Sequence, residues 1–347
     1  MAQWSVLLNY VCQINGALMD AATLQTFTSP VVLFFVLGLL AAFAKSDLAI
    51  PEAIAKGMSL YLMAAIGLKG GVAVSKSGID ATVLSALAAG IAAGFIIPFF
   101  AYVVLKGFGR LDRINAGAVA AHYGSISVVT FVTAVEILEF QGKPAGGYMV
   151  AVMATMESPA ILSGLLLARG FGSKNGDANS TKEMLHEVFF NASVVLMLGA
   201  FVIGLIGGAD GFSDVSPFFE AGFKGVLCLF LLDMGLIAAR RIMDSRSITW
   251  RLVAIGLFFP LVNGVIGTTL GTVVGLDVGS SAALGVLCAS ASYIAVPAAM
   301  RLALPEADPG IYLTMSLSIT FPFNVLINIG LISSFASLLA GMTGAPS

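Results

Sequence analysis

Polar residues interrupt two long apolar stretches at places where Leu or Val would be expected. The first stretch is residues 118–136, and the second is residues 289–297, which ends at Pro297. The interrupting residues are Gly124, Ser125, Ser127, Ser290 and Ser292. A membrane helix that unwinds at mid-depth frees N–H and carbonyl groups that lipid cannot bond, so they must face protein or a polar cavity. Because half-helix N-termini and serine hydroxyls donate hydrogen bonds, the pattern predicts a site for a small, oxygen-rich anion.

An acidic side chain and two more oxygen donors occupy neighbouring apolar stretches. Glu157 lies halfway along residues 145–169, and Thr320 and Asn324 lie within residues 309–341. An acid inside the membrane costs on the order of 3 kcal/mol on insertion scales, so it is a functional candidate by default. Unwound carbonyls, half-helix C-termini and other oxygen donors suit sodium. We therefore expect a sodium site formed by Glu157, Thr320 and Asn324, and no other metal or cofactor.

Five more side chains are secondary candidates, and each has a structural alternative. They are Lys69, His122, Tyr123, Asp233 and Tyr293. His122 can relay protons or sense pH, but it can also serve packing and hydrogen bonding. Tyr123 and Tyr293 can contact a ligand or fill space beside the interruptions, and Asp233 can pair with Lys69 across two helices. The serines themselves can be small packing residues that bond to the preceding helical turn.

The composition places the chain among membrane proteins with several spans. Hydrophobic residues make up 58% of its 347 residues, charged residues make up 10%, and the mean hydropathy is +0.98. Soluble domains are roughly 45–50% apolar and ~25% charged. The three cysteines are scattered and show neither a disulfide framework nor zinc spacing. No Lys or Arg precedes Lys45, so the positive start of a cleavable signal peptide is missing, and no nucleic-acid partner is expected.

Ten apolar segments predict ten transmembrane helices, since each is close to or above the ~20 residues that cross a bilayer. The segments are residues 29–45, 51–68, 80–106, 112–138, 145–169, 183–208, 216–240, 247–274, 278–303 and 309–341. Residues 1–28 contain Trp4 and Tyr10 and are expected to lie at the membrane interface. Most of the 17 Lys and Arg residues fall on one side of this arrangement. This bias predicts that the crowded side is cytoplasmic and that both termini lie outside.

A polar linker, residues 170–182, divides the spans into two sets of five and is predicted to be cytoplasmic. The two halves, residues 29–169 and 183–342, share features at a fixed spacing. Ser125 and Ser290 are 165 positions apart, as are the serines two positions further on. Because five is odd, the second copy enters the membrane upside down. Inverted repeats with interrupted helices at matching places are typical of secondary transporters, so we expect an all-α membrane fold in which the fourth and ninth helices are broken and cross.

Several motifs follow one another along nearly the whole chain. They are Ile50-Pro51-Glu52-Ala53-Ile54, Ile66-Gly67-Leu68-Lys69-Gly70-Gly71, Gly124-Ser125 followed by Thr133 and Glu136, Met156-Glu157-Ser158-Pro159-Ala160, the Ser290-x-Ser292 run, and Arg301 to Pro305 followed by Tyr312. Together these motifs resemble the sodium-dependent bicarbonate transporters of the SbtA type. The resemblance implies inward symport of bicarbonate with sodium, with the anion held between the two broken helices.

The resemblance also implies a division of the helices into two domains. The gate domain comprises residues 29–68 and 183–240, and the core domain comprises residues 80–169 and 247–341. Our hypothesis is an elevator-like movement of the core past the gate. The resemblance further implies a homotrimer in a bacterial-type inner membrane and a PII-like cytoplasmic regulator. The chain departs from the family at Tyr293, where cyanobacterial members place an Asp.

Other functions are compatible with parts of the pattern. The same architecture can carry another small anion or exchange sodium for protons, but such antiporters usually show paired carboxylates at the crossing, and here Glu157 stands almost alone. An intramembrane serine hydrolase would need a histidine such as His122 or His186 near a serine. The chain lacks a Gly-x-Ser-Gly element, so an enzyme is not expected.

Overall fold

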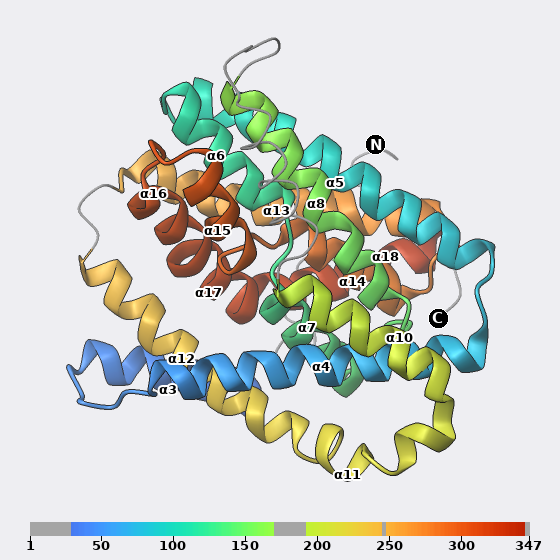
Figure 1. Ribbon diagram of the computed structural model, residues 1–347. Helices are drawn as coiled ribbons and strands as arrows, with labels where there is room; N and C mark the ends of the chain where they lie inside the picture. The colour runs from blue at the N-terminus through green and yellow to red at the C-terminus, as the bar shows by residue number, and fades with distance from the viewer. Residues whose placement is uncertain (1–28, 170–191, 245–247, 344–347) are drawn as a thin grey trace, which may run out of the picture.

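The computed structural model describes residues 29–169, 192–244 and 248–343, and its regular elements are helices (Figure 1). The predicted interfacial segment 1–28 and the predicted linker 170–182 lie outside the described residues, as does His186. The all-α class expected from the composition is confirmed for the part of the chain that the structure describes.

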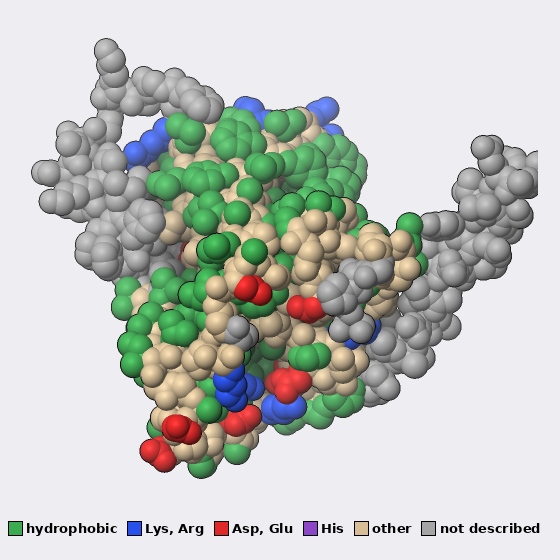
Figure 2. All heavy atoms as spheres, turned by 90° about the vertical axis from the view of Figure 1, so that its right-hand side faces the viewer, with side chains coloured by type: hydrophobic (Ala, Val, Ile, Leu, Met, Phe, Trp, Pro, Cys, Tyr) green, Lys and Arg blue, Asp and Glu red, His purple; other side chains and the backbone are tan. Residues whose placement is uncertain are grey.

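Eight helical segments of the described chain are long and apolar enough to cross a membrane. The apolar helices Pro30–Phe43 and Val278–Ala289 are shorter. The described chain therefore has long apolar helices that fit a membrane protein with several spans, while ten spans in a five-plus-five arrangement stays a prediction. Figure 2 shows wide apolar areas on one face, with the charged side chains confined to its upper edge and its lower half.

The helices follow one another through mostly short connections. In order they are α3 (Pro30–Phe43), α4 (Glu52–Ser77), α5 (Ala81–Gly107), α6 (Arg113–Gly124), α7 (Val128–Phe140), α8 (Met149–Arg169), α10 (Ala192–Ser213), α11 (Ser216–Phe219), α12 (Phe223–Asp244), α13 (Trp250–Val273), α14 (Val278–Ala289), α15 (Ala295–Ala303), α16 (Pro309–Leu313), η1 (Thr314–Thr320), α17 (Phe321–Phe323), η2 (Asn324–Asn328) and α18 (Ile329–Thr343). The last span runs from α16 to α18 and contains the wider π-helical turns η1 and η2.

The helices form two layers, which Figure 1 shows one above the other. In the lower layer, here called the four-helix layer, α3 packs along α12, and α4 packs along α10. The rest, here called the main layer, contains one bundle of α5, α6 and α8 and a second bundle of α13, α14 and α18. The layers meet where α4 and α10 contact α8 and where α12 contacts η1.

The two bundles begin their central helices in the same way. Asp112 accepts hydrogen bonds from the N–H groups of Ile114 and Asn115 at the start of α6, and Asp277 accepts one from the N–H of Ser280 at the start of α14. Such caps satisfy N–H groups that a helix leaves free in its first turn. Partial burial raises the pKa of Asp112, but the hydrogen bonds from Asn115 and Ile114 outweigh it and hold that pKa below its usual value.

Helix α4 runs to Ser77, well past the predicted end of its span at residue 68. The sequence Lys69-Gly70-Gly71 reads as the end of an apolar span, but both glycines are inside the helix. Gly71 lies against α10 so closely that an added Cβ would overlap the carbonyl oxygen of Phe201. Small residues allow membrane helices to approach this closely, so Gly71 serves packing and does not end the helix.

We predict that Gly71→Ala lowers the stability of the protein in detergent by about 1–3 kcal/mol, because the new methyl group must push α4 and α10 apart. Gly57→Ala on the same helix is the matched control, since a Cβ at Gly57 meets no atom of the described chain within 4 Å. Thermal unfolding followed by fluorescence measures both variants. Equal unfolding temperatures for the two variants would contradict the close packing of α4 on α10.

Candidate functional site

Two helices of the main layer are broken at the predicted places. Helix α6 ends at Gly124 and α7 begins at Val128, while α14 ends at Ala289 and α15 begins at Ala295. At both breaks the residue after the first half is a serine with extended backbone: φ and ψ are −83° and 175° at Ser125, and −81° and 163° at Ser290. The prediction that these two spans are interrupted is therefore confirmed.

The two breaks bond to each other. The N–H of Ser127 donates to the hydroxyl oxygen of Ser290 at 2.9 Å, and the N–H of Ser292 donates to the carbonyl oxygen of His122 at 2.9 Å. The hydroxyl of Ser290 in turn donates to the carbonyl of Leu287 at 2.8 Å. These bonds satisfy backbone groups that neither half-helix satisfies, which is the requirement for unwound backbone at membrane depth. Three of the predicted anion-site serines thus lie together at the contact between the breaks.

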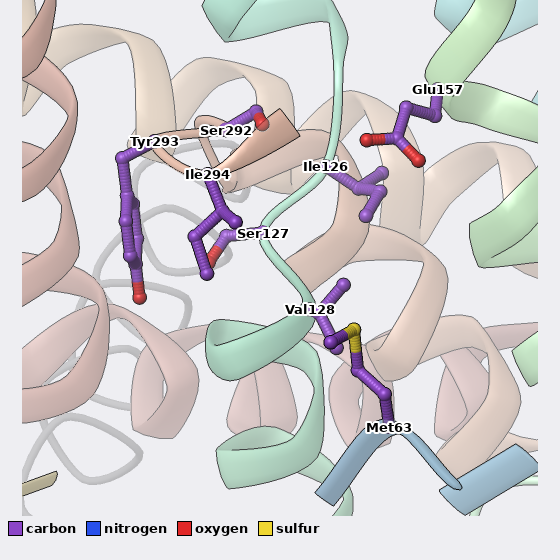
Figure 3. A pocket seen from close by; sticks show the side chains of 8 residues that line it. All are labelled: Met63, Ile126, Ser127, Val128, Glu157, Ser292, Tyr293 and Ile294. Carbon is purple, nitrogen blue, oxygen red and sulfur yellow. The ribbon is translucent and has the colours of Figure 1, made fainter. Parts of the chain in front are cut away.

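A small cavity opens beside the two breaks, between the main layer and α4 (Figure 3). Its lining residues are Met63, Ile126, Ser127, Val128, Glu157, Ser292, Tyr293 and Ile294. In Figure 3 the Glu157 carboxylate projects from α8 toward Ile126, and Met63 approaches from α4. The cavity volume is about 10 Å³, which is room for about one water-sized guest.

Glu157 supplies the carboxylate of this cavity. Its exposed fraction is 2%, so its side chain is held almost entirely away from water. Helix α8 continues through Pro159, which lacks an N–H and so cannot bond the carbonyl of Thr155 one turn earlier. The cavity therefore combines one buried carboxylate with the N-terminal end of α7 at Ser127, where positive partial charge gathers.

Ser125 is completely buried, and its hydroxyl has no hydrogen-bond partner among the described residues. Gly124 packs against α5 and α8, where an added Cβ would overlap the ring of Pro98 and lie 3.2 Å from Ala160. Neither residue lines the cavity. Ser127 and Ser292 thus line the cavity, and Ser290 lies at the contact between the two breaks. Ser125 lies at the start of the first break, and its hydroxyl has no partner in the described chain.

Thr320 and Asn324 are predicted sodium ligands, but both side chains bond elsewhere in the main layer. Pro260 leaves the carbonyl of Gly256 without its helical donor, and the hydroxyl of Thr320 donates to that carbonyl at 2.8 Å. The hydroxyl of Tyr123 then donates to Thr320 at 2.6 Å. Thr320 therefore supplies the donor that the Gly256 carbonyl lacks in α13, and Tyr123 and Thr320 both have a structural role.

Asn324 donates from its amide nitrogen to the carbonyl of Ala289 at 2.9 Å, and so caps the C-terminal end of α14. Its amide oxygen accepts a hydrogen bond from Asn328 at 2.8 Å. Neither Thr320 nor Asn324 lines the cavity next to Glu157. The structure therefore does not bring the three predicted sodium ligands together in this conformation.

His122 precedes the first break and Tyr293 lies in the second, and of the two only Tyr293 lines the cavity. The Nδ1 of His122 donates to the carbonyl of Ala118 at 2.7 Å, and the ring stacks on Tyr312 with centroids 4.4 Å apart. Its Nε2 is buried and unpartnered within the described chain. Tyr293 packs edge-on against Phe321 with centroids 5.4 Å apart and lines the cavity, so of the two it is the one beside Glu157.

The predicted pairing of Asp233 with Lys69 is not formed. The ammonium group of Lys69 lies over the ring of Phe223, 5.5 Å from its centroid, where it gains a cation–π interaction. Phe223 begins α12, and Asp233 lies ten residues further on, about 15 Å along the helix axis. Lys69 therefore cannot reach it, and the Oδ2 of Asp233 is buried with no hydrogen-bond partner in the described part of the chain.

Sequence reasoning missed the apolar half of the cavity wall. Met63, Ile126, Val128 and Ile294 carry no chemistry that marks them in an apolar chain. For Ile126 and Val128 a signal existed, since they flank Ser127 directly in the unwound segment. Met63 carried none, because its place depends on how the four-helix layer packs on the main layer.

No curated protein matches the chain. A family model does match, and it covers residues 30–337, which include both breaks, Glu157 and the helices of both layers. On that match, the chain belongs to the Na+-dependent bicarbonate transporter superfamily.

Proposed function

We propose that this chain carries bicarbonate into the cell together with sodium, and that it is a carrier without enzymatic activity. One observation supports this most: two broken membrane helices are hydrogen-bonded to each other directly beside a buried carboxylate. The family match adds the ions that the superfamily's description names.

The N-terminal end of the half-helix α7 suits the anion. Helix α7 begins at the cavity, where Ser127 already caps the N–H of Thr130 at 3.2 Å. The N–H groups of Val128 and Val129 belong to the same first turn and have no acceptor within the helix. Together with the positive end of the helix dipole, they favour a small oxyanion.

Sodium fits the opposite ends of the half-helices. The C-terminal ends of α6 and α14 lie at the breaks and carry partial negative charge, and Glu157 adds a carboxyl group nearby. Among the eight lining residues of the cavity, Glu157 is the single carboxylate. An exchange of sodium for protons usually relies on paired carboxylates at the crossing, so the site favours symport of an anion.

An inverted repeat is part of the proposal. Helices α6 and α14 each have 12 residues, begin after a capping Asp and end at a Ser with the same extended backbone. Asp112 and Asp277 are 165 positions apart, the same spacing that separates Ser125 from Ser290. Duplication of one ancestral unit explains this agreement, and a transporter with ten spans and two such halves binds its ions where the halves meet.

The two layers support an elevator-like movement, with the four-helix layer as gate and the main layer as core. The cavity lies between them, since Met63 comes from α4 and the other lining residues come from the main layer. It holds about one water-sized guest, so bicarbonate needs the layers to separate. Lys224 on α12 forms an ion pair with Glu136 on α7, and this ion pair links the layers in the present conformation.

The remaining features of the proposal come from the charge distribution and the family resemblance. The bias of Lys and Arg supports a cytoplasmic location for residues 170–182 and outside locations for both termini. The resemblance supports a homotrimer in the inner membrane and a PII-like cytoplasmic regulator.

We predict sodium-dependent uptake of radiolabelled bicarbonate into liposomes that contain the purified protein, assayed at alkaline pH so that little CO₂ crosses the lipid. Glu157→Gln should raise the sodium concentration for half-maximal uptake by roughly tenfold to a hundredfold, because a contact with a charged group is worth about 1.5–3 kcal/mol. Potassium in place of sodium is the control. Uptake that is equal in both salts would refute the coupling.

We predict opposite effects for two serines of the breaks. Ser125→Ala should leave the unfolding temperature unchanged while uptake falls, because no described group bonds its hydroxyl. Ser290→Ala removes the hydrogen bonds to Leu287 and from Ser127, so it should lower stability by about 1–3 kcal/mol. Thermal unfolding and liposome uptake measure both. Full transport by Ser125→Ala would remove this serine from the anion site.

We predict that a cross-link between the layers stops transport. Lys224→Cys and Glu136→Cys are introduced together in a chain whose three native cysteines are replaced, since the ends of these two long side chains touch in the structure. Cysteine side chains are shorter, so a bis-methanethiosulfonate reagent with a spacer joins them. The reagent should abolish uptake, and a reductant should restore it, whereas each single variant should be insensitive to both. Undiminished uptake by the cross-linked protein would exclude a movement of the core past the gate.

A further inference from the structure

Asn263 is a buried polar residue that the site described above does not use. It lies in the middle of α13, its exposed fraction is 0%, and neither its amide nitrogen nor its amide oxygen has a hydrogen-bond partner among the described residues. Buried polar groups are nearly always bonded, because an unpaired one costs free energy. Asn328 shows the ordinary case: its amide donates to Pro260 at 3.0 Å and to Asn324 at 2.8 Å.

The packing of α13 places Asn263 beside the two breaks. Four positions earlier, the ring of Phe259 contacts the ring of Tyr123 near the end of α6, with centroids 4.8 Å apart. Four positions later, a Cβ added to Gly267 would lie 2.7 Å from the sulfur of Cys288 near the end of α14. Residues four apart share one face of a helix, so Asn263 faces the space between the ends of α6 and α14.

The neighbouring glycine fixes the depth of Asn263. A Cβ added to Gly264 would lie 3.5 Å from the Cβ of Ala289, the last residue of α14. Asn263 is therefore level with the start of the second break. The hydroxyl of Ser125, at the start of the first break, is also buried and unbonded in the described chain. Asn263 thus adds buried, unbonded polar atoms on the α13 side of the breaks, outside the cavity that Glu157 lines.

We propose that Asn263 is a substrate-binding residue that recognises the hydrogen-bearing edge of bicarbonate. A primary amide presents an N–H donor and a carbonyl acceptor side by side. Bicarbonate presents the matching edge, with an anionic oxygen to accept from the amide nitrogen and an O–H to donate to the amide oxygen. The inference rests on the proposed function. Asn263 does not line the cavity, so this contact belongs to a conformation in which the breaks open toward α13.

This chemistry separates bicarbonate from other small ions. Sodium would use only the amide oxygen and leave the nitrogen unpaired. Nitrate is a planar oxyanion of similar size, but it has no O–H and leaves the amide oxygen unpaired. A site that bonds a substrate hydroxyl discriminates strongly against an analogue that lacks it. Asn263 therefore contributes selectivity for a hydrogen-bearing oxyanion.

The test compares Asn263→Leu with the wild type in liposomes that contain the purified protein. The KM for bicarbonate should rise at least tenfold, while inhibition of uptake by nitrate should stay the same or become relatively stronger. The unfolding temperature should equal or exceed that of the wild type, because the variant removes an amide that has no partner in the described chain. Asn328→Leu is the matched control: it breaks two hydrogen bonds, so it should lower the unfolding temperature.

The outcomes separate this inference from the function on which it rests. If the wild type takes up no bicarbonate in a sodium-dependent way, the proposed function fails. If the wild type transports and Asn263→Leu keeps the wild-type KM, only the role of Asn263 is overturned. If Asn263→Leu is destabilised as much as Asn328→Leu, Asn263 is a structural residue, and the inference is again overturned.

Discussion

Backbone polar groups at half depth in a membrane must find partners inside the protein, and this constraint shapes the centre of the molecule. Two helices stop there, and each break would leave donors and acceptors exposed to an apolar surrounding. The breaks satisfy each other, through the N–H of Ser127 on Ser290 and the N–H of Ser292 on the carbonyl of His122. Because the partner of each break is the other break, the two must stay together, and any movement of the site carries both.

The same constraint explains why several polar residues near the site are not ligands in this conformation. Pro260 opens a gap in α13, and Thr320 closes it with help from Tyr123. Asn324 closes the end of α14 at Ala289. These bonds join α13, α14 and the last span to one another beside the breaks. Ser125 and Asn263 take no part in these repairs, and no group of the described chain bonds the polar atoms of their side chains.

The sequence predicts the broken helices well, because a run such as Gly124-Ser125 or a serine pair before Pro297 has few uses in an apolar span. It also indicates Glu157, because an acid inside a membrane must have a purpose. It cannot show that Thr320 bonds Gly256, because that contact joins residues 64 positions apart. The sequence does not single out Asn263 either, because its neighbours in the chain are ordinary for a membrane helix. The order of residues along the chain is enough to predict the breaks, whereas three-dimensional packing decides which polar atoms have no hydrogen-bond partner.

The central claim is that the joined breaks bind the ions, and a cryo-electron microscopy structure in lipid nanodiscs tests it most directly. The protein would be imaged in sodium bicarbonate and, separately, in potassium chloride. We expect added density between the two breaks, within bonding distance of the first turn of α7 or of Glu157, in sodium bicarbonate only. Identical maps at the breaks in both salts, with ion density elsewhere in the protein, would contradict it.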